Sequence, residues 1–190
     1  MNYIEELKVL NWCNSYIQYV QLRDKGLKKE AKKALDQFLL DFKKQDTQSR
    51  RNFIVIVNEI VYYHNNYNVF LPFNLYEKLI NPEIQEWIKE EPTNPIPLIW
   101  TRDIDSLLKA IVIDPQNQIT LNMLGDLIVN KISMNQHELT AGFAYDGNPK
   151  EDVQLIDIFS TYMENLVDIV KRDTFINILA SLKKNAVDNI

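Results

Sequence analysis

Apolar residues recur at helical spacing along almost the whole chain, and this periodicity limits the possible folds more than any other feature of the sequence. Segments at about 3–22, 27–42 and 47–64 each place apolar side chains three or four residues apart. Taken alone, the apolar run 53–57 would also suit a buried strand, but the period continues beyond the length of a typical strand. We therefore predict an all-α fold, an irregular multi-helix bundle of about eight helices.

Pairs of a capping residue followed by proline mark three expected helix starts after residue 80. These pairs are Asn81–Pro82, Asp114–Pro115 and Asn148–Pro149. Glu151 lies three residues after Asn148, which is the spacing of a capping box. From there the apolar period continues to Val170, so we expect a long helix. We also expect Asp103 or Asp105 to cap a helix and a last helix to follow Asp173.

The segment 91–100, EPTNPIPLIW, holds three of the seven prolines. A residue that precedes proline is disfavoured in the α region of backbone conformation. We therefore expect an extended connection here. The length of 190 residues favours one helical domain over residues 1–190. A subdivision near 92–102 is left open.

The charge and cysteine content narrow the classes of function. The net charge of -5 argues against a nucleic-acid partner, and the basic run at 28–33 is expected to be a solvated helix face. No apolar run approaches the length that crosses a membrane, and the N-terminus lacks the pattern of a secretory signal. The lone Cys13 lies in an apolar stripe and is expected to be a core residue. We expect a cytoplasmic protein without a membrane partner.

The stretch from His137 to Asp157 gathers residue types that are scarce elsewhere. It holds two of the four glycines, Gly142 and Gly147, between aromatic and acidic residues. Because glycine adopts positive φ readily, this pattern predicts a shaped loop between two helices. The candidate partner-binding residues are His137, Glu138, Phe143, Tyr145, Asp146 and Asp152.

The pair His137 and Glu138 resembles an acid–base pair in composition, but adjacent side chains on a helix point about 100° apart. We expect His137 to cap the end of the preceding helix instead. The only other histidine, His64, is distant in sequence, and no metal-binding, phosphate-binding or nucleophile motif is present. We therefore assign no catalytic residue, metal or cofactor, and favour a protein that is not an enzyme.

Residues 107–128, LLKAIVIDPQNQITLNMLGDLI, resemble the junction between two tetratricopeptide repeats. The resemblance covers only these residues, and no second copy of the 34-residue period is found. It implies stacking of helix pairs in the C-terminal half. One alternative function is therefore a structural adaptor with a concave groove between helix pairs.

A second resemblance spans residues 82–156. It rests on Trp87, EPTNPIPLIW, IDPQNQ, HEL with Gly142, the Gly147-x-Pro149 turn and Asp152. This pattern is similar to that of small helical bacterial proteins that are mostly uncharacterised, some of which resemble the immunity partners of secreted toxins. The resemblance implies an inhibitor in the cytosol that blocks a toxin domain by occlusion, and no catalytic residue carries over.

The leading hypothesis is a non-enzymatic, protein-binding module of toxin-immunity type. An acidic face around the loop would suit a basic toxin domain, because complementary charge accelerates association and selects partners. The main alternative is a helical enzyme or small-ligand-binding protein with a site near residues 137–152, lined by His137, Glu138 and Asp146. The sequence makes no prediction of oligomeric state.

Overall fold

The computed structural model describes residues 3–64 and 67–190. It is 77% helical, and no strand occurs among the described residues. Eight helices in the described ranges have ten or more residues, so the prediction of an all-α, multi-helix fold is confirmed. The chain forms two compact units, Met1–Pro92 and Thr93–Ile190. The division falls at the start of the segment where the sequence left a subdivision open.

None of the helices in the described ranges is both long enough and apolar enough to span a lipid bilayer. Thr47–His64 and the two helices of 19 residues have the length, but polar side chains interrupt each of them. This finding agrees with the absence of a long apolar run in the sequence.

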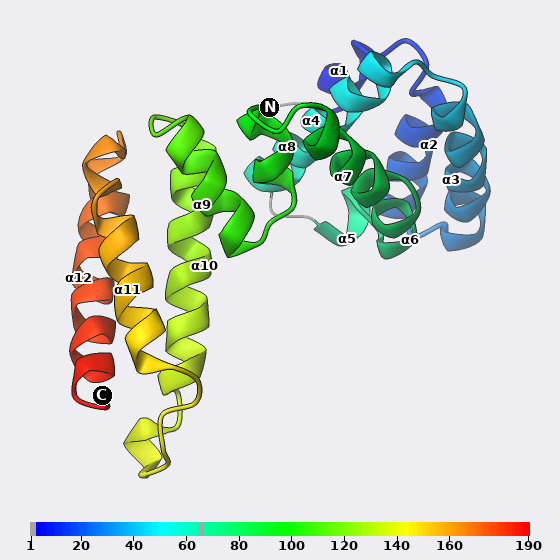
Figure 1. Ribbon diagram of the computed structural model, residues 1–190. Helices are drawn as coiled ribbons and strands as arrows, with labels where there is room; N and C mark the ends of the chain where they lie inside the picture. The colour runs from blue at the N-terminus through cyan, green and yellow to red at the C-terminus, as the bar shows by residue number, and fades with distance from the viewer. Residues whose placement is uncertain (1–2, 65–66) are drawn as a thin grey trace. The chain divides into compact units, whose positions relative to one another are not determined.

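The N-terminal unit is built from short and medium helices, with a hairpin of two helices at one side (Figure 1). Its elements are α1 (Tyr3–Lys8), α2 (Asn14–Asp24), α3 (Lys28–Lys43), α4 (Thr47–His64), α5 (Tyr67–Phe70), α6 (Phe73–Leu75), the π-helix η1 (Tyr76–Ile80) and α7 (Asn81–Glu90). Helices α2 and α3 form the hairpin, and α4 contacts α1, α5 and α7. The predicted helices at 27–42 and 47–64 are confirmed to within one residue.

Aromatic side chains from α2, α3 and α4 meet in the core of this unit. The ring centroids of Phe38 and Phe53 lie 4.8 Å apart, and Tyr16 lies 4.9 Å from Phe53 and 5.0 Å from Phe38. All three side chains are fully buried. Aromatic pairs of this kind contribute about 0.5–1.5 kcal/mol each beyond the area they bury. Cys13 is also fully buried, which confirms its predicted place in the core.

The prediction of one helix over residues 3–22 was wrong. Helix α1 ends at Lys8 and α2 begins at Asn14, with a turn between them. This turn places Trp12 flat against Phe38, with centroids 5.7 Å apart and planes 7° from parallel. Val9, an apolar residue within the predicted helix 3–22, is 74% exposed as a result. Tertiary packing of one aromatic ring therefore overrides the local helical pattern.

The prediction of Asn81 as a helix cap was also wrong, because the chain is helical from Phe73 to Glu90 without a break. The amide of Asn81 donates to the carbonyl of Tyr76, five residues back, as in a π-helix. Pro82 explains the wider turn. Its ring would clash with the carbonyl four residues earlier in a regular α-helix, and it has no N–H to donate.

The C-terminal unit contains four longer helices that run alternately up and down (Figure 1). Its elements are α8 (Pro95–Trp100), α9 (Ile104–Ile113), α10 (Gln118–Gln136), the 3₁₀-helix η2 (Leu139–Ala141), α11 (Pro149–Ser160), the 3₁₀-helix η3 (Met163–Asn165) and α12 (Ile169–Val187). Helix α12 packs against α10 and α11, while α9 packs against α10 and α8. Phe159 and Phe175 meet edge to face at 5.7 Å in the core.

The prediction of an extended segment over residues 91–100 was wrong from Pro95 onward, where α8 begins. The side chain of Asn94 accepts a hydrogen bond of 3.0 Å from the Ile96 amide and caps this helix. Pro95 and Pro97 both stand in the first turn. Amides there have no partner within the helix, so their loss costs no hydrogen bond.

Helix caps decide the remaining boundaries. Asp103 and Asn148 cap α9 and α11 as predicted, with hydrogen bonds of 2.8 Å to the Ser106 amide and 3.1 Å to the Lys150 amide. The predicted cap at Asp114 was wrong, because Asn117 caps α10 through the Thr120 amide at 3.0 Å. Asp114 instead ends α9 and belongs to the turn between the two helices.

The end of α11 and the start of α12 also differ from prediction. Helix α11 ends at Ser160 instead of continuing to Val170, and α12 begins at Ile169, before Asp173. Asp168 caps α12, accepting from the Lys171 amide at 3.0 Å. The intervening turn buries Leu166, which is 2% exposed, so an apolar residue that fitted the helical period packs in the core from a turn.

Candidate functional site

The candidate site is the loop of residues 137–148, called the 137–148 loop below. It joins α10 to α11 and projects beyond the ends of both helices, at the end of the unit where α12 also ends (Figure 1). Gly142 and Gly147 have φ of 84° and 102°, the left-handed conformations that their clustering in the sequence predicted. Residues 141–144 are all exposed. The predicted shaped loop is therefore present at the surface.

Gly147 lets the loop return closely to α10. A Cβ atom at this position would lie 2.9 Å from the side-chain nitrogen of Asn135. Immediately before it, the Asp146 amide donates a hydrogen bond of 2.9 Å to the Asn135 carbonyl. The glycine is therefore required twice, for its positive φ and for the space that its missing side chain leaves.

A buried carboxylate at the start of α11 holds the loop in place through hydrogen bonds. Asp152 stands in the first turn of α11 and is 1% exposed. Its Oδ2 accepts hydrogen bonds of 2.7 Å from Asn135 Nδ2 and 2.7 Å from the Tyr145 hydroxyl. Lys131 Nζ lies 3.4 Å from the other carboxylate oxygen. A buried charge is tolerated only when it is paired and hydrogen-bonded, and the N-terminal end of a helix also favours a carboxylate.

The anchor extends to α12 through Gln136, which is 7% exposed. Its Nε2 donates to the Leu182 carbonyl at 2.8 Å and to the Tyr145 hydroxyl at 3.3 Å. Asn185 Nδ2 donates to Gln136 Oε1 at 3.0 Å. The loop is therefore cross-linked to α10, α11 and α12 by side chains that are mostly shielded from water, where hydrogen bonds are stronger.

Tyr145 is the link between the loop and this anchor. Burial is the largest cause that raises its pKa to about 12; a hydrogen bond from Gln136 acts against this, and Asp152 adds to the increase. The phenol therefore stays protonated at neutral pH and can donate to the carboxylate.

The remaining predicted residues lie on the outside of the loop. Glu138, Phe143 and Asp146 are exposed, and Phe143 is 62% exposed. His137 Nδ1 lies 2.6 Å from the Met134 carbonyl, which confirms its predicted role at the end of α10. Its Nε2 lies 3.5 Å from Glu138 Oε1, because the backbone leaves the helix at this point. Of the six candidates, Asp152 is buried and Tyr145 is half-buried, so these two support the loop from inside.

Sequence reasoning did not find Lys131, Asn135 and Gln136, the partners that α10 supplies to the anchor. One signal was present. Asp152 falls in register with the apolar stripe of Ile156 and Phe159, and a carboxylate in an apolar stripe needs a buried polar partner. The sequence alone does not say which helix supplies that partner.

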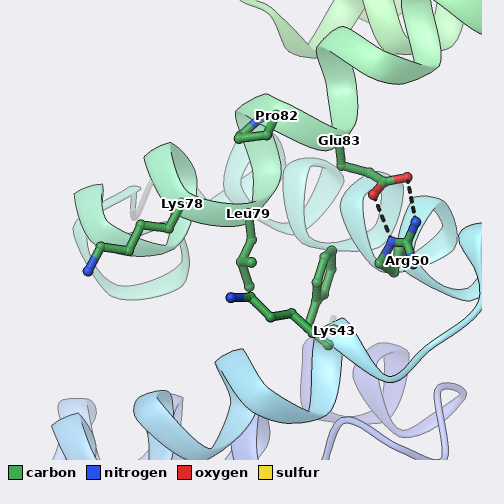
Figure 2. Close-up of a pocket in the computed structure, with 7 residues that line it drawn as sticks. Lys43, Arg50, Lys78, Leu79, Pro82 and Glu83 are labelled. Carbon is green, nitrogen blue, oxygen red and sulfur yellow. Dashed lines mark hydrogen bonds and ion pairs between the residues drawn. The ribbon is translucent and has the colours of Figure 1, made fainter.

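The N-terminal unit carries a separate pocket of about 280 Å³ (Figure 2). Phe42, Leu79 and Pro82 give it an apolar lining. Lys43 and Lys78 stand on one side, and neither pairs with a carboxylate among the described residues. An ion pair closes the other side, with Arg50 Nε 2.7 Å from Glu83 Oε2. The pocket is open to solvent and its charged lining residues are mainly basic. The sequence did not predict it, because its two lysines are 35 positions apart.

In the ranges that the structure describes, no group of three or more His, Cys, Asp or Glu side chains is arranged to hold a metal ion. Two further pockets, of about 350 and 560 Å³, lie in the C-terminal unit. His137, Glu138 and Asp146 line none of these three pockets.

No protein family, curated protein or solved structure matches this chain. The resemblances to toxin-immunity proteins and to tetratricopeptide repeats therefore stay predictions. The 137–148 loop is defined as a candidate site by its own geometry.

Proposed function

We propose that the chain is a protein-binding module that presents the 137–148 loop to a protein partner. The observation that carries this proposal is the combination of an exposed loop surface with a buried polar anchor. A loop that is already held in one conformation loses little conformational entropy on binding. The anchor fixes the loop to three helices, so its outer side chains are presented in a constant arrangement.

Phe143 is the expected centre of the contact. It is 62% exposed at the outer part of the loop, and buried aromatic anchors often dominate binding energy. Glu138 and Asp146 are exposed on the same loop and would form a charged rim. A rim of this kind mainly accelerates association and rejects partners of like charge.

The expected partner is a basic protein domain. The chain has a net charge of -5, and the 137–148 loop carries two exposed carboxylates, Glu138 and Asp146, in addition to Phe143. With the resemblance to immunity proteins, this supports the narrower proposal of an inhibitor that covers a basic toxin domain. Blockage would be steric, so no residue of this chain takes part in chemistry.

The enzyme alternative requires His137, Glu138 and Asp146 to line a site that encloses a ligand. His137 and Glu138 have side chains 51% and 55% exposed, and the imidazole is engaged with the end of α10. Their positions fit contact with a protein surface better than enclosure of a small molecule.

The proposal is tested by co-expression with the product of the neighbouring reading frame, followed by measurement of growth and of complex formation. The wild-type chain should prevent growth arrest and form a stable complex. Phe143→Ala should raise the Kd at least about 30-fold, the effect of losing a hot-spot residue. Asp146→Lys should mainly slow association.

Matched controls are available in the N-terminal unit. Phe73 is 77% exposed, and Asp24 is an exposed acid, so Phe73→Ala and Asp24→Lys repeat the two substitutions away from the loop. Both should bind and protect as the wild type does. Equal affinity of wild type and Phe143→Ala would contradict the assignment of the loop, and absence of both protection and complex would contradict the toxin-immunity proposal.

A further inference from the structure

Helix α12 carries two apolar stripes, and one of them is about half exposed within the C-terminal unit. The buried stripe is formed by Phe175, Leu179, Leu182 and Ala186. The second stripe is formed by Ile169, Ile176, Ala180 and Val187. Its three large members are 60%, 45% and 50% exposed. Helix α12 packs against α10 and α11, and the second stripe is a further apolar face that these two contacts leave about half exposed.

Exposed apolar residues concentrate in this part of the chain. Of the 18 large hydrophobic side chains that are exposed among the described residues, seven lie between Val167 and Ile190. Five of these seven lie on α12, and three of the five, Ile169, Ile176 and Val187, belong to the second stripe. Single exposed apolar residues are normal, but several on one face of a helix mark an interaction surface. The distribution therefore points to α12 as a docking element.

The exposed stripe is part of a heptad seam. Its six positions are separated alternately by four and three residues, which is the spacing of a coiled-coil interface. The seam reads Ile169, Asp173, Ile176, Ala180, Lys183 and Val187. The seam therefore contains two residues of opposite charge, Asp173 and Lys183, which are its second and its second-to-last positions.

The seam is complementary to itself when two copies run antiparallel. With a two-fold axis at the level of residue 178, Ile169 faces Val187 of the second copy and Ile176 faces Ala180 of the second copy. Asp173 faces Lys183 of the second copy. Every apolar position then meets an apolar one, and each charge meets its opposite. A parallel pair would instead set Asp173 against Asp173 and Lys183 against Lys183, which is destabilising.

We propose that α12 forms an antiparallel homodimer through this seam. Lys183 already pairs with Asp157 of α11, and Asp173 of the second copy would join this pair from the open side. Ala180 opposite Ile176 alternates a small with a large side chain, which allows the two helices to approach closely. This inference is independent of the proposed partner-binding function.

The size of the surface sets the expected strength. Nineteen residues of helix extend about 28 Å, and one helix face covers less area than the roughly 1,200–2,000 Å² of a stable interface. We therefore expect a weak dimer, with a Kd on the order of 10 μM.

The test is sedimentation velocity on the full chain at concentrations spanning the expected Kd. The wild type should shift from monomer to dimer as the concentration rises. Ile176→Glu places a charge in the seam and should weaken dimerisation at least tenfold. Ile178→Glu is the matched control, because Ile178 lies on the same helix but outside the seam, and it should dimerise as the wild type does. Circular dichroism verifies that each variant is folded.

A charge exchange tests the pairing of Asp173 with Lys183. Asp173→Lys alone sets two lysines against each other, and Lys183→Asp alone sets two aspartates against each other, so each variant should be monomeric. An equimolar mixture of the two variants restores both opposite-charge contacts and should dimerise. Cysteines introduced as Ile169→Cys in one chain and Val187→Cys in another should form a mixed disulfide, as expected only for antiparallel helices.

Three results would overturn the proposal. They are a wild type that stays monomeric at all concentrations, equal effects of Ile176→Glu and Ile178→Glu, and a charge-exchange mixture that stays monomeric. A cross-link between two copies of residue 169 in preference to 169 with 187 would refute the antiparallel arrangement.

Discussion

Tyr145→Phe tests whether the buried anchor holds the 137–148 loop and its three helices together. The substitution removes one oxygen atom and keeps the ring, so it deletes the 2.7 Å hydrogen bond to Asp152 and the 3.3 Å bond from Gln136. Asp152 keeps Asn135 as a donor and Lys131 as a nearby cation. Gln136 keeps its bond to the Leu182 carbonyl. The change is therefore a partial loss of the anchor.

The expected loss of unfolding free energy is about 1.5–2 kcal/mol for the C-terminal unit. A hydrogen bond to a charged acceptor contributes about 1.5–3 kcal/mol. The lower part of this range applies because Tyr145 is only half-buried and water can partly replace its hydroxyl. A loss of this size corresponds to a decrease of about 10- to 30-fold in the protection of slowly exchanging amides.

Hydrogen exchange on the full chain measures this loss separately for each unit. Amides of α10, α11 and α12 should lose protection, while those of α2, α3 and α4 should not. Tyr162→Phe is the matched control, because the Tyr162 hydroxyl has no hydrogen bond among the described residues. It should change stability by less than about 0.5 kcal/mol. Equal protection in the Tyr145→Phe and Tyr162→Phe variants would refute the anchor.

The raised pKa of Tyr145 adds a pH dependence of known sign. The folded unit holds the phenol proton more tightly than the unfolded chain, with a pKa of about 12 against the ordinary 10.0. This contribution to stability is complete below pH 10 and is lost as the pH rises through 12. Thermal melting should therefore show a steeper loss of stability in this range for the wild type than for Tyr145→Phe. Parallel losses would contradict the proposed environment of the phenol.

Three further substitutions or reactions test the packing. Gly125→Ala should destabilise the C-terminal unit by about 1 kcal/mol in urea denaturation. The new Cβ would lie 2.6 Å from the Phe175 ring, and this overpacking outweighs the better helix propensity of alanine. A gain in stability would show that the aromatic rings can move. Arg51→Ala should cost about 1.5–3 kcal/mol, since Arg51 is 6% exposed and its guanidinium joins α4 to the half-exposed carboxylates of Glu90 and Glu91. A loss below about 1 kcal/mol would show that this pairing is replaceable. Cys13 should resist alkylation in the folded chain and react in urea, because burial raises its pKa to about 12; rapid reaction without urea would contradict its burial.

The sequence predicted those features that depend on local chemistry. Helical periodicity identified α3 and α4 almost to the residue, because both have a continuous apolar stripe and no interior proline. The caps at Asp103 and Asn148 were predictable because short polar side chains satisfy the free amides of a first turn. The exposed loop was predictable from two closely spaced glycines.

The errors occurred where distant packing decided the outcome. Trp12 interrupts the first predicted helix because it packs against rings from α3 and α4. The residues that precede Pro95 and Pro97 were predicted to be extended, although the place of both prolines in the first turn makes them compatible with α8. The anchor of the candidate site joins Asp152 directly to Asn135, 17 positions earlier, and to Gln136 only through the Tyr145 hydroxyl. Sequence spacing does not encode such contacts.

The two proposed surfaces can be used at the same time, and this leads to a prediction of stoichiometry. Gln136 links Tyr145 of the 137–148 loop to Leu182 and Asn185 in the last turns of α12. An antiparallel pair of α12 helices would therefore place the two loops at opposite ends of the dimer, where each remains open to a partner. The complex should contain two chains and two partners at high concentration, and one of each for Ile176→Glu, with the same affinity per loop. Competition between partner binding and dimerisation in mass measurements would show instead that the two surfaces overlap, and one of the two assignments would then have to be abandoned.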